Sequence, residues 1–305
     1  MLKKLKLKNW MQFISERFNP LTHLSMIFLF VLTHFQIIQF YSVVREINYF
    51  DFVLAFFYVT FFFFKLRLYD EIKDYDSDLL LRPQRPLPRG LLEVDDLKLA
   101  IGILIGLQFV LASLLNFSSL AFVGVTVAYS LLMYNEFFIP KWLGPKLTTY
   151  AVTHTFVTIL LSVSLFDLIS DSHFSTAMPL GFSLPLTLYA ISTWFLFNVF
   201  EFARKTYSKD EERSDVLSYS KVWGRYGAVV LTLSQAIIAS YFAHYLLSPS
   251  TFMTYGLALL CFAVGILGLV YASLNRPGIA KLYRGLSSGF IIFYFLIINL
   301  RFFWG

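Results

Sequence analysis

Three aspartates, Asp70, Asp74 and Asp78, follow one another at intervals of four residues. In a helix this spacing places their side chains along one face, each about one turn from the next. Carboxylates stacked in this way repel one another, so the arrangement makes sense if a cation lies between them. Mg2+ accepts such hard oxygen ligands, usually one or two carboxylates per ion with substrate phosphates in the remaining positions. The spacing therefore predicts a magnesium site, with Glu71 as a further candidate ligand.

Basic residues alternate with these acids and follow them. They are Arg67, Lys73, Arg82, Arg85 and Arg89. In a soluble protein such a cluster is more often a solvated helix end. Here it adjoins a hydrophobic run, and a mixture of acids and bases at such a place is suited to holding a metal and a polyanion together. This stretch, residues 67–89, is called the first polar cluster below.

The composition is typical of a polytopic membrane protein. Hydrophobic residues make up 57% of the 305 residues and charged residues only 14%, whereas about a quarter of residues are charged in soluble domains. The net charge of +6 is expected from positive cytoplasmic loops, so we predict no nucleic-acid partner. The single Cys261 excludes an intramolecular disulfide and a cysteine-based metal site.

Stretches of about 20 mainly apolar residues predict an all-α bundle of about nine transmembrane helices. The predicted spans are 21–43, 51–69, 97–116, 118–134, 147–169, 183–202, 227–247, 250–272 and 286–304. Residues 1–20 are basic and lack the cleavage site of a signal peptide, so we expect a retained segment on the membrane surface. Residues 21–305 are predicted to form one transmembrane domain.

Nine spans divide the positive charges almost completely between the two sides of the membrane. Every Lys and Arg except Arg45 and Arg301 falls on the side of the N-terminus, and the longest loop of the other side, about 170–182, has none. The positive-inside rule places the charged side in the cytoplasm and the C-terminus outside. We expect a bacterial inner-membrane protein with its site on the cytoplasmic face.

The length of the second span supports this placement. No helix-breaking residue interrupts the chain between Asp51 and Asp78. A continuous helix over these residues is about 42 Å long, against a hydrocarbon core of about 30 Å. The aspartates are therefore predicted to project beyond the core.

A second polar cluster, residues 198–221, follows the sixth span on the same side. Asn198, Glu201 and Lys205 share one helical face, with Arg204 three residues beyond Glu201. Asn and Glu offer oxygens to a metal, while Arg and Lys neutralise phosphate. An ordinary charged helix end is the alternative. Lys141, after the fourth span, is a further candidate for phosphate binding or a snorkelling interfacial residue.

The whole chain resembles the UbiA superfamily of intramembrane prenyltransferases. That family's first motif has the form Asn-Asp-x-x-Asp-x-x-x-Asp, and Asp70, Glu71, Asp74 and Asp78 stand at its four positions. The segment Arg85-Pro-Leu-Pro-Arg89-Gly90 matches the one that follows the motif in the family.

The second motif departs from the family pattern. The family usually carries Asp-x-x-x-Asp there, whereas this chain has Glu201-x-x-Arg204-Lys205, with Asp215 further on. This leaves open whether the second polar cluster binds metal or grips diphosphate directly.

The resemblance implies a Mg2+-dependent transfer of an isoprenyl group from an isoprenyl diphosphate to an unidentified acceptor within the membrane. The implied catalytic and metal-binding residues are Asp70, Glu71, Asp74, Asp78, Asn198 and Glu201. The implied diphosphate-binding residues are Arg67, Lys73, Arg85, Lys141, Arg204 and Lys205. The resemblance also implies that the isoprenyl diphosphate ionises to an allylic carbocation. Burial of the site in the membrane would shield this cation from water.

Two alternatives remain open at this point. A terpene cyclase of the same family ionises the same diphosphate but captures the cation within its own chain. An ion or small-molecule transporter belongs to another class. Against the transporter, the acids lie at one membrane edge and no charge is expected at the centre of a span, where transport pathways usually bind their ions.

Overall fold

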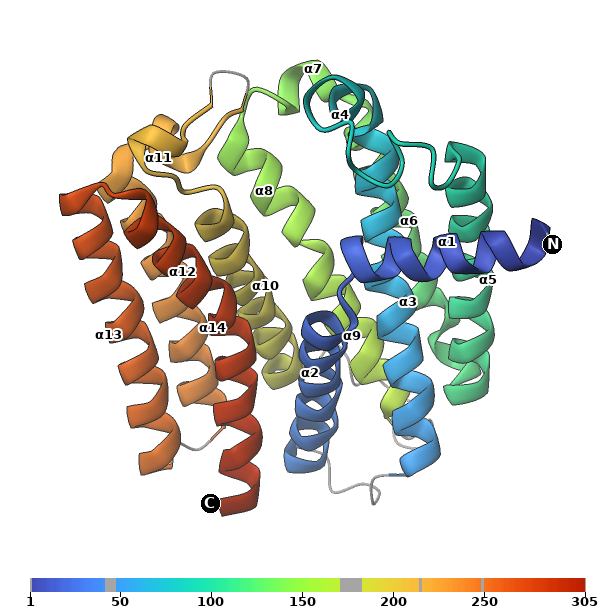
Figure 1. Cartoon of the computed structure of the whole chain (residues 1–305). Coiled ribbons are helices and arrows are strands. Elements are labelled where there is room, and N and C mark those ends of the chain that lie inside the picture. The colour runs from blue at the N-terminus through green and yellow to red at the C-terminus, as the bar shows by residue number, and fades with distance from the viewer. Residues whose placement is uncertain (1, 42–47, 171–182, 214–215, 248–249, 305) are drawn as a thin grey trace.

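The computed structural model describes residues 2–41, 48–170, 183–213, 216–247 and 250–304, and within these ranges all regular secondary structure is helical (Figure 1). The spanning segments are formed by α2 (Pro20–Tyr41), α3 (Tyr49–Lys73), α5 (Val94–Leu115), α6 (Leu120–Tyr134), α8 (Leu147–Thr155), α9 (Val157–Ile169), α10 (Leu184–Arg204), α12 (Gly224–Leu246), α13 (Thr251–Leu274) and α14 (Pro277–Trp304). The other elements are α1 (Leu2–Arg17), α4 (Tyr75–Leu81), α7 (Pro140–Leu143), α11 (Tyr219–Val222), η1 (Phe117–Ser119), η2 (Glu136–Phe138) and η4 (Lys209–Glu211).

The described residues contain nine segments long and apolar enough to cross a membrane, with α8 and α9 together forming the fifth and η1 with α6 the fourth. The predicted all-α, nine-span integral membrane protein is confirmed. The last span begins earlier than predicted, at Pro277 and not at 286, because Asn275 turns the chain in a left-handed conformation and proline then starts the new helix. Arg45, residues 171–182 of the predicted outer loop, and Asp215 lie outside the described residues.

The predicted continuous helix from Asp51 to Asp78 is wrong at one place. The helix α3 ends at Lys73, Asp74 forms a turn, and α4 begins at Tyr75 in a new direction (Figure 1). Backbone N–H groups still bond across the turn, from Asp74 to the carbonyl of Asp70 at 2.9 Å and from Asp78 to that of Asp74 at 2.8 Å. The hydrogen bonds between residues four apart are therefore kept. The change of helix axis, however, means that Asp78 does not lie on one helical face with Asp70 and Asp74.

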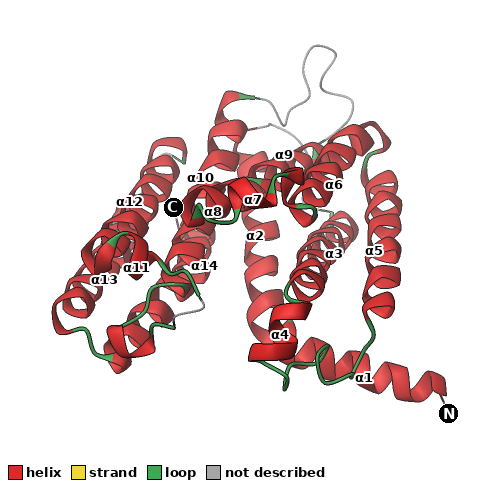
Figure 2. Ribbon diagram, turned by 90° about the horizontal axis from the view of Figure 1, so that it is seen from above, coloured by secondary structure: helices red, strands yellow, loops and turns green. Residues whose placement is uncertain are grey.

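The spanning helices form two groups joined by a central layer. Seen from above, α3, α5 and α6 lie on one side and α12 and α13 on the other, with α2, α10 and α14 between them (Figure 2). The helix α10 packs against α8, α9, α12 and α14. The Phe63 ring of α3 stacks on the Phe197 ring of α10 with centroids 5.6 Å apart, and Phe30 of α2 meets both edge-on. An aromatic layer therefore fills the centre of the bundle.

The first helix lies across α3 and α5 and not along them (Figure 1). Phe13 is fully buried, with Trp10 and Phe64 around its ring at 5.6 and 6.5 Å between centroids. Leu7 and Met11 on the other face stay exposed. The helix is thus fixed to the bundle by one apolar face and presents a second one outward.

Replacing Phe13 by Ala should release α1 from the bundle. Loss of a fully buried phenylalanine costs about 3–5 kcal/mol, so we expect a lower unfolding temperature in detergent and faster protease cleavage within residues 1–20. Leu7→Ala, at a position that is 64% exposed, is the matched control and should change neither. Equal behaviour of the two variants would mean that α1 is not held by this contact.

Candidate functional site

The predicted polar residues lie mainly near the ends of α3 and α10, which reach the same edge of the bundle (Figure 1). Most of them come from the end of α3, from α4 with the loop after it, and from the last two turns of α10, and α8 reaches the same edge between these elements. Local sequence explains these ends: α3 stops where several carboxylates succeed one another, and α10 stops after consecutive cations that suit a helix C-terminus.

Of the four acids predicted as metal ligands in the first polar cluster, two remain open to solvent. Asp70 is exposed on the last turn of α3, and the Asp74 side chain is 53% exposed. Arg85 approaches Asp74 only to 3.8 Å, and Asp70 forms no ion pair in the part of the chain that the structure describes. Both carboxylates can accept a cation without breaking a strong internal contact.

Asp78 is enclosed by arginines. Its side chain is only 3% exposed, Arg85 donates to one of its oxygens, and Arg82 lies 3.4 Å from the other. The loop that carries Arg85 is anchored by Leu87, which is 2% exposed, and turns back at Gly90 with φ of +76°. Asp78 thus fixes the Arg-Pro-Leu-Pro loop against α4.

Glu71 forms a buried ion pair that the sequence did not reveal. Its carboxylate is 1% exposed and accepts from Arg67 and from Arg17 of α1, whose Nε lies 2.7 Å from Oε1. The second oxygen of Glu71 is buried and has no hydrogen-bond partner among the described residues. Nothing in the local pattern couples Arg17 to a residue 54 positions away.

Lys73 joins the first polar cluster to α8. Its Nζ donates to the Tyr150 hydroxyl at 2.8 Å and lies 3.2 Å from Glu136. The Tyr150 ring stacks on His154 with centroids 3.9 Å apart. Sequence reasoning did not single out Glu136, Tyr150 or His154, because none of them belongs to a recognisable spacing.

The turn that presents Glu136 has an unusual backbone. Glu136, Phe137 and Phe138 all have positive φ, from 49° to 59°. Residues other than glycine rarely adopt this left-handed region, and runs of them persist only where the surrounding structure determines them. The conformation brings Glu136 back beside Lys73.

In the second polar cluster Glu201 is held by both neighbouring cations. Arg204 donates to its two oxygens at 2.5 and 2.9 Å, and Lys205 lies at 3.3 Å. Asn198 is buried and engaged elsewhere, accepting from Thr155 at 2.5 Å and donating to Gln235 at 3.2 Å. One carboxylate, Glu201, faces two cations, Arg204 and Lys205, so the end of α10 carries a net positive charge.

The two polar clusters face each other. Asp70 and Arg204 are close enough for their charges to attract. Tyr150 lies within electrostatic reach of Asp70, and His154 within reach of Glu201. The structure therefore assembles acids of the first cluster, donors of α8 and cations of the second cluster around one place. Lys141 is exposed on α7, and no contact joins it to the others among the described residues.

The segment after α10 is ordered by its own polar contacts. Tyr219 is buried against Phe202, and its N–H bonds to the carbonyl of Lys205 at 3.0 Å. Glu211 accepts from Arg284 at 2.6 and 2.9 Å, and this contact lowers the pKa of Glu211 to about 2. These contacts fix the exit of α10 and hence the positions of Arg204 and Lys205.

One expectation about the spans is wrong. Lys65 lies inside α3, is fully buried and donates to Gln108 of α5 at 2.9 Å, with the ring of Phe62 4.9 Å away. A charge-bearing side chain is therefore present within a span. Lys65 is four residues from the middle of α3, so an absence of charge near the span centres does not count against a transporter.

Among the described residues no three His, Cys, Asp or Glu side chains converge into a group that could hold a metal by itself. The two open carboxylates, Asp70 and Asp74, nevertheless match what Mg2+ usually takes from a protein when substrate phosphates complete its shell.

Comparison with known proteins identifies the class. The model of the UbiA prenyltransferase family matches residues 39–295. The chain belongs to this family of membrane prenyltransferases, whose members generally use Mg2+ and act on isoprenyl diphosphates. No curated protein matches the chain.

Solved structures share the fold. One is a digeranylgeranylglyceryl phosphate synthase, with a TM-score of 0.59 at 18% identity, covering 97% of this chain and 98% of that one. Another is the apo structure of a UbiA homologue from Aeropyrum pernix K1, with a TM-score of 0.58 at 16% identity, covering 90% and 97%. At such identities the likeness extends to the fold alone.

Glu71→Gln should destabilise the protein strongly. Removing one partner from a buried ion pair leaves uncompensated charge, here on Arg17 and Arg67, and costs about 3–5 kcal/mol. Thermal unfolding in detergent measures the loss. Asp76→Asn, at an exposed position in α4, is the control and should shift the unfolding temperature little. A small effect of Glu71→Gln would show that the arginines find other partners.

Proposed function

We propose that the protein transfers an isoprenyl group from an isoprenyl diphosphate to a lipid-soluble acceptor, aromatic or otherwise, in a Mg2+-dependent reaction at the cytoplasmic edge of the membrane. The observation that carries this is the pair of open carboxylates, Asp70 and Asp74, opposite the net positive charge that Arg204 and Lys205 leave around Glu201. Membership of a prenyltransferase family favours this over a transporter. In this proposal residues 1–20 rest on the cytoplasmic membrane surface and residues 21–305 form the transmembrane domain.

Asp70 and Asp74 would hold the metal. Among the other predicted ligands, Glu71 and Asp78 are already paired with arginines and Asn198 with neutral side chains. When bound, Mg2+ supplies Lewis-acid neutralisation of the leaving diphosphate. Two carboxylates leave positions for diphosphate oxygens, so metal and donor bind together.

The second polar cluster then grips the diphosphate directly. Glu201 neutralises one of its two cations and orients the Arg204 guanidinium through two hydrogen bonds. The remaining positive charge attracts phosphate oxygens, and a guanidinium binds them in bidentate fashion. On the α8 side, Lys73 and Tyr150 add donors next to Asp70. In this proposal Arg204 and Lys205, which stand at the place where the family's second motif ends in an acid, bind phosphate and not metal.

The isoprenyl chain would lie toward the aromatic layer. Phe63 is seven residues before Asp70 and Phe197 four before Glu201, so the stacked rings lie one to two turns deeper in the bundle. The bond between the first carbon and the diphosphate oxygen breaks, and the diphosphate leaves with the electron pair. The acceptor attacks the allylic cation and loses a proton. Aromatic faces stabilise such a cation.

The metal ligands can be tested by the release of diphosphate. Purified protein with geranylgeranyl or farnesyl diphosphate should release diphosphate with Mg2+ and not with EDTA. Asp74→Asn should lower the rate about 100-fold or more, because it removes charge stabilisation of the leaving group. Asp76→Asn, two residues away and exposed, should keep it. Unchanged release by Asp74→Asn would refute the site, and a cyclised product formed without acceptor would indicate a cyclase.

Direct binding of the diphosphate by Arg204 predicts a change in the donor KM. Arg204→Gln should raise the donor KM about tenfold or more, since a hydrogen bond to a charged group contributes about 1.5–3 kcal/mol. The matched control is Lys209→Gln, which removes an exposed positive charge on the same segment. If instead Arg204→Gln raised the requirement for Mg2+ and left the donor KM unchanged, the second cluster would belong to the metal site.

A further inference from the structure

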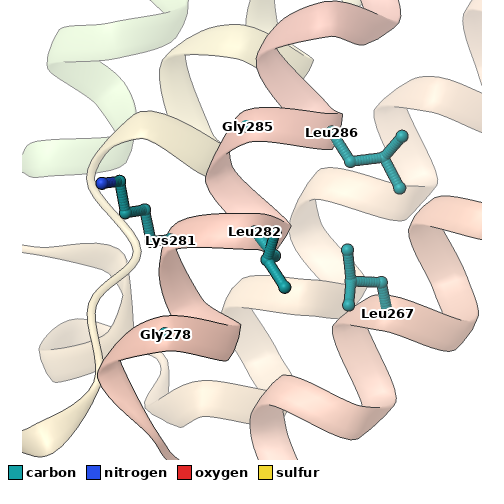
Figure 3. Close-up of a pocket in the computed structure, with 6 residues that line it drawn as sticks. All are labelled: Leu267, Gly278, Lys281, Leu282, Gly285 and Leu286. Atoms are coloured by element: carbon teal, nitrogen blue, oxygen red, sulfur yellow. The ribbon is translucent and has the colours of Figure 1, made fainter.

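A groove of about 620 Å³ lies on the surface of the bundle between α13 and α14 (Figure 3). Its lining consists of Leu267, Gly278, Lys281, Leu282, Gly285 and Leu286. The proposed function uses none of these residues.

The groove is open because α14 lacks side chains there. Gly278 and Gly285 lie two turns apart on one face, and no atom comes within 4 Å of the place where either would carry a Cβ. Leu282 is 64% exposed and Leu274, at the end of α13, is 52% exposed. On a membrane-spanning bundle an apolar surface of this kind is covered by lipid chains.

Lys281 adds a positive charge to this apolar groove. Its side chain extends to one side of α14, away from the leucines that form the other side (Figure 3). Arg284, one turn further on, is neutralised by Glu211, whereas Lys281 has no ion-pair partner among the described residues. The turn and first helical residues, 275–284, contain three cations and no acid. The first turns of α14 also carry the partial positive charge of a helix N-terminus.

We propose that this groove binds one anionic phospholipid. An acyl chain lies over Gly278 and Gly285 against the leucines, and the headgroup phosphate is held by Lys281. Basic pockets between spanning helices bind lipid headgroups in this way, and a lysine places its charge at the interface while its stem stays in apolar surroundings.

The bound lipid would also stabilise the position of the segment after α10, which belongs to the second polar cluster. Asn275 accepts from the Lys209 N–H at 3.0 Å, and Arg284 bonds to the carbonyl of Thr206 at 3.0 Å. The start of α14 is thereby tied to the segment after α10.

Native mass spectrometry of the purified protein in neutral detergent can test this. The protein is titrated with dioleoylphosphatidylglycerol and, separately, with dioleoylphosphatidylcholine. We expect the first phosphatidylglycerol to bind more tightly than phosphatidylcholine, and Lys281→Gln to reduce that preference roughly five-fold, the effect of about 1 kcal/mol per lysine. Lys98→Gln, at another exposed lysine, should leave the preference unchanged. Gly285→Leu, which fills the groove, should weaken binding of both lipids.

Three results would overturn the proposal. One is an equal preference in wild type and Lys281→Gln, and another is undiminished binding by a folded Gly285→Leu variant. The third is displacement of phosphatidylglycerol by added farnesyl diphosphate in wild type and Lys98→Gln but not in Lys281→Gln, which would assign the groove to an isoprenyl diphosphate. Lys281 is exposed, so its variant stays folded and decides the matter even if Gly285→Leu does not fold.

Discussion

A carboxylate at the edge of an apolar helical bundle can keep its charge only where cations or water stabilise it. Glu71 satisfies this condition through two arginines, and Asp78 through Arg85 and Arg82. Asp70 and Asp74 satisfy it through exposure. The same requirement thus divides these four acids into two that hold the structure together, Glu71 and Asp78, and two that are available to a ligand, Asp70 and Asp74.

The buried pair around Glu71 makes α1 part of the site. Arg17 reaches Glu71 from a helix that lies across the bundle, and Glu16 binds Arg89 of the following loop at 2.7 and 3.0 Å. This contact lowers the pKa of the exposed Glu16 carboxyl. Burial of Phe13 holds the helix in place. The position of Asp70 therefore depends on a segment that hydropathy alone would set apart from the membrane domain.

On the opposite side of the site, at the end of α10, cations outnumber acids. Glu201 is shared by Arg204 and Lys205, so a net positive charge remains facing Asp70. Lys73, Tyr150 and Glu136 link the two sides through α8 and the left-handed turn before it. A substrate with two phosphates and a metal complements this distribution, because negative and positive groups lie on opposing helices.

The sequence by itself determined the membrane class, the nine spans and the two polar clusters. Hydrophobic length and the spacing of side chains along one helix are local properties, and each can be read within about 20 residues. It predicted Asp70, Asp74 and Arg204 as residues of one site without showing how they meet. Only the tertiary structure decided which charges neutralise one another. Arg17 and Glu71, or Lys73 and Glu136, are brought together by helix packing between distant segments, and the turn at Asp74 and the buried Lys65 likewise depend on neighbours that no local pattern names.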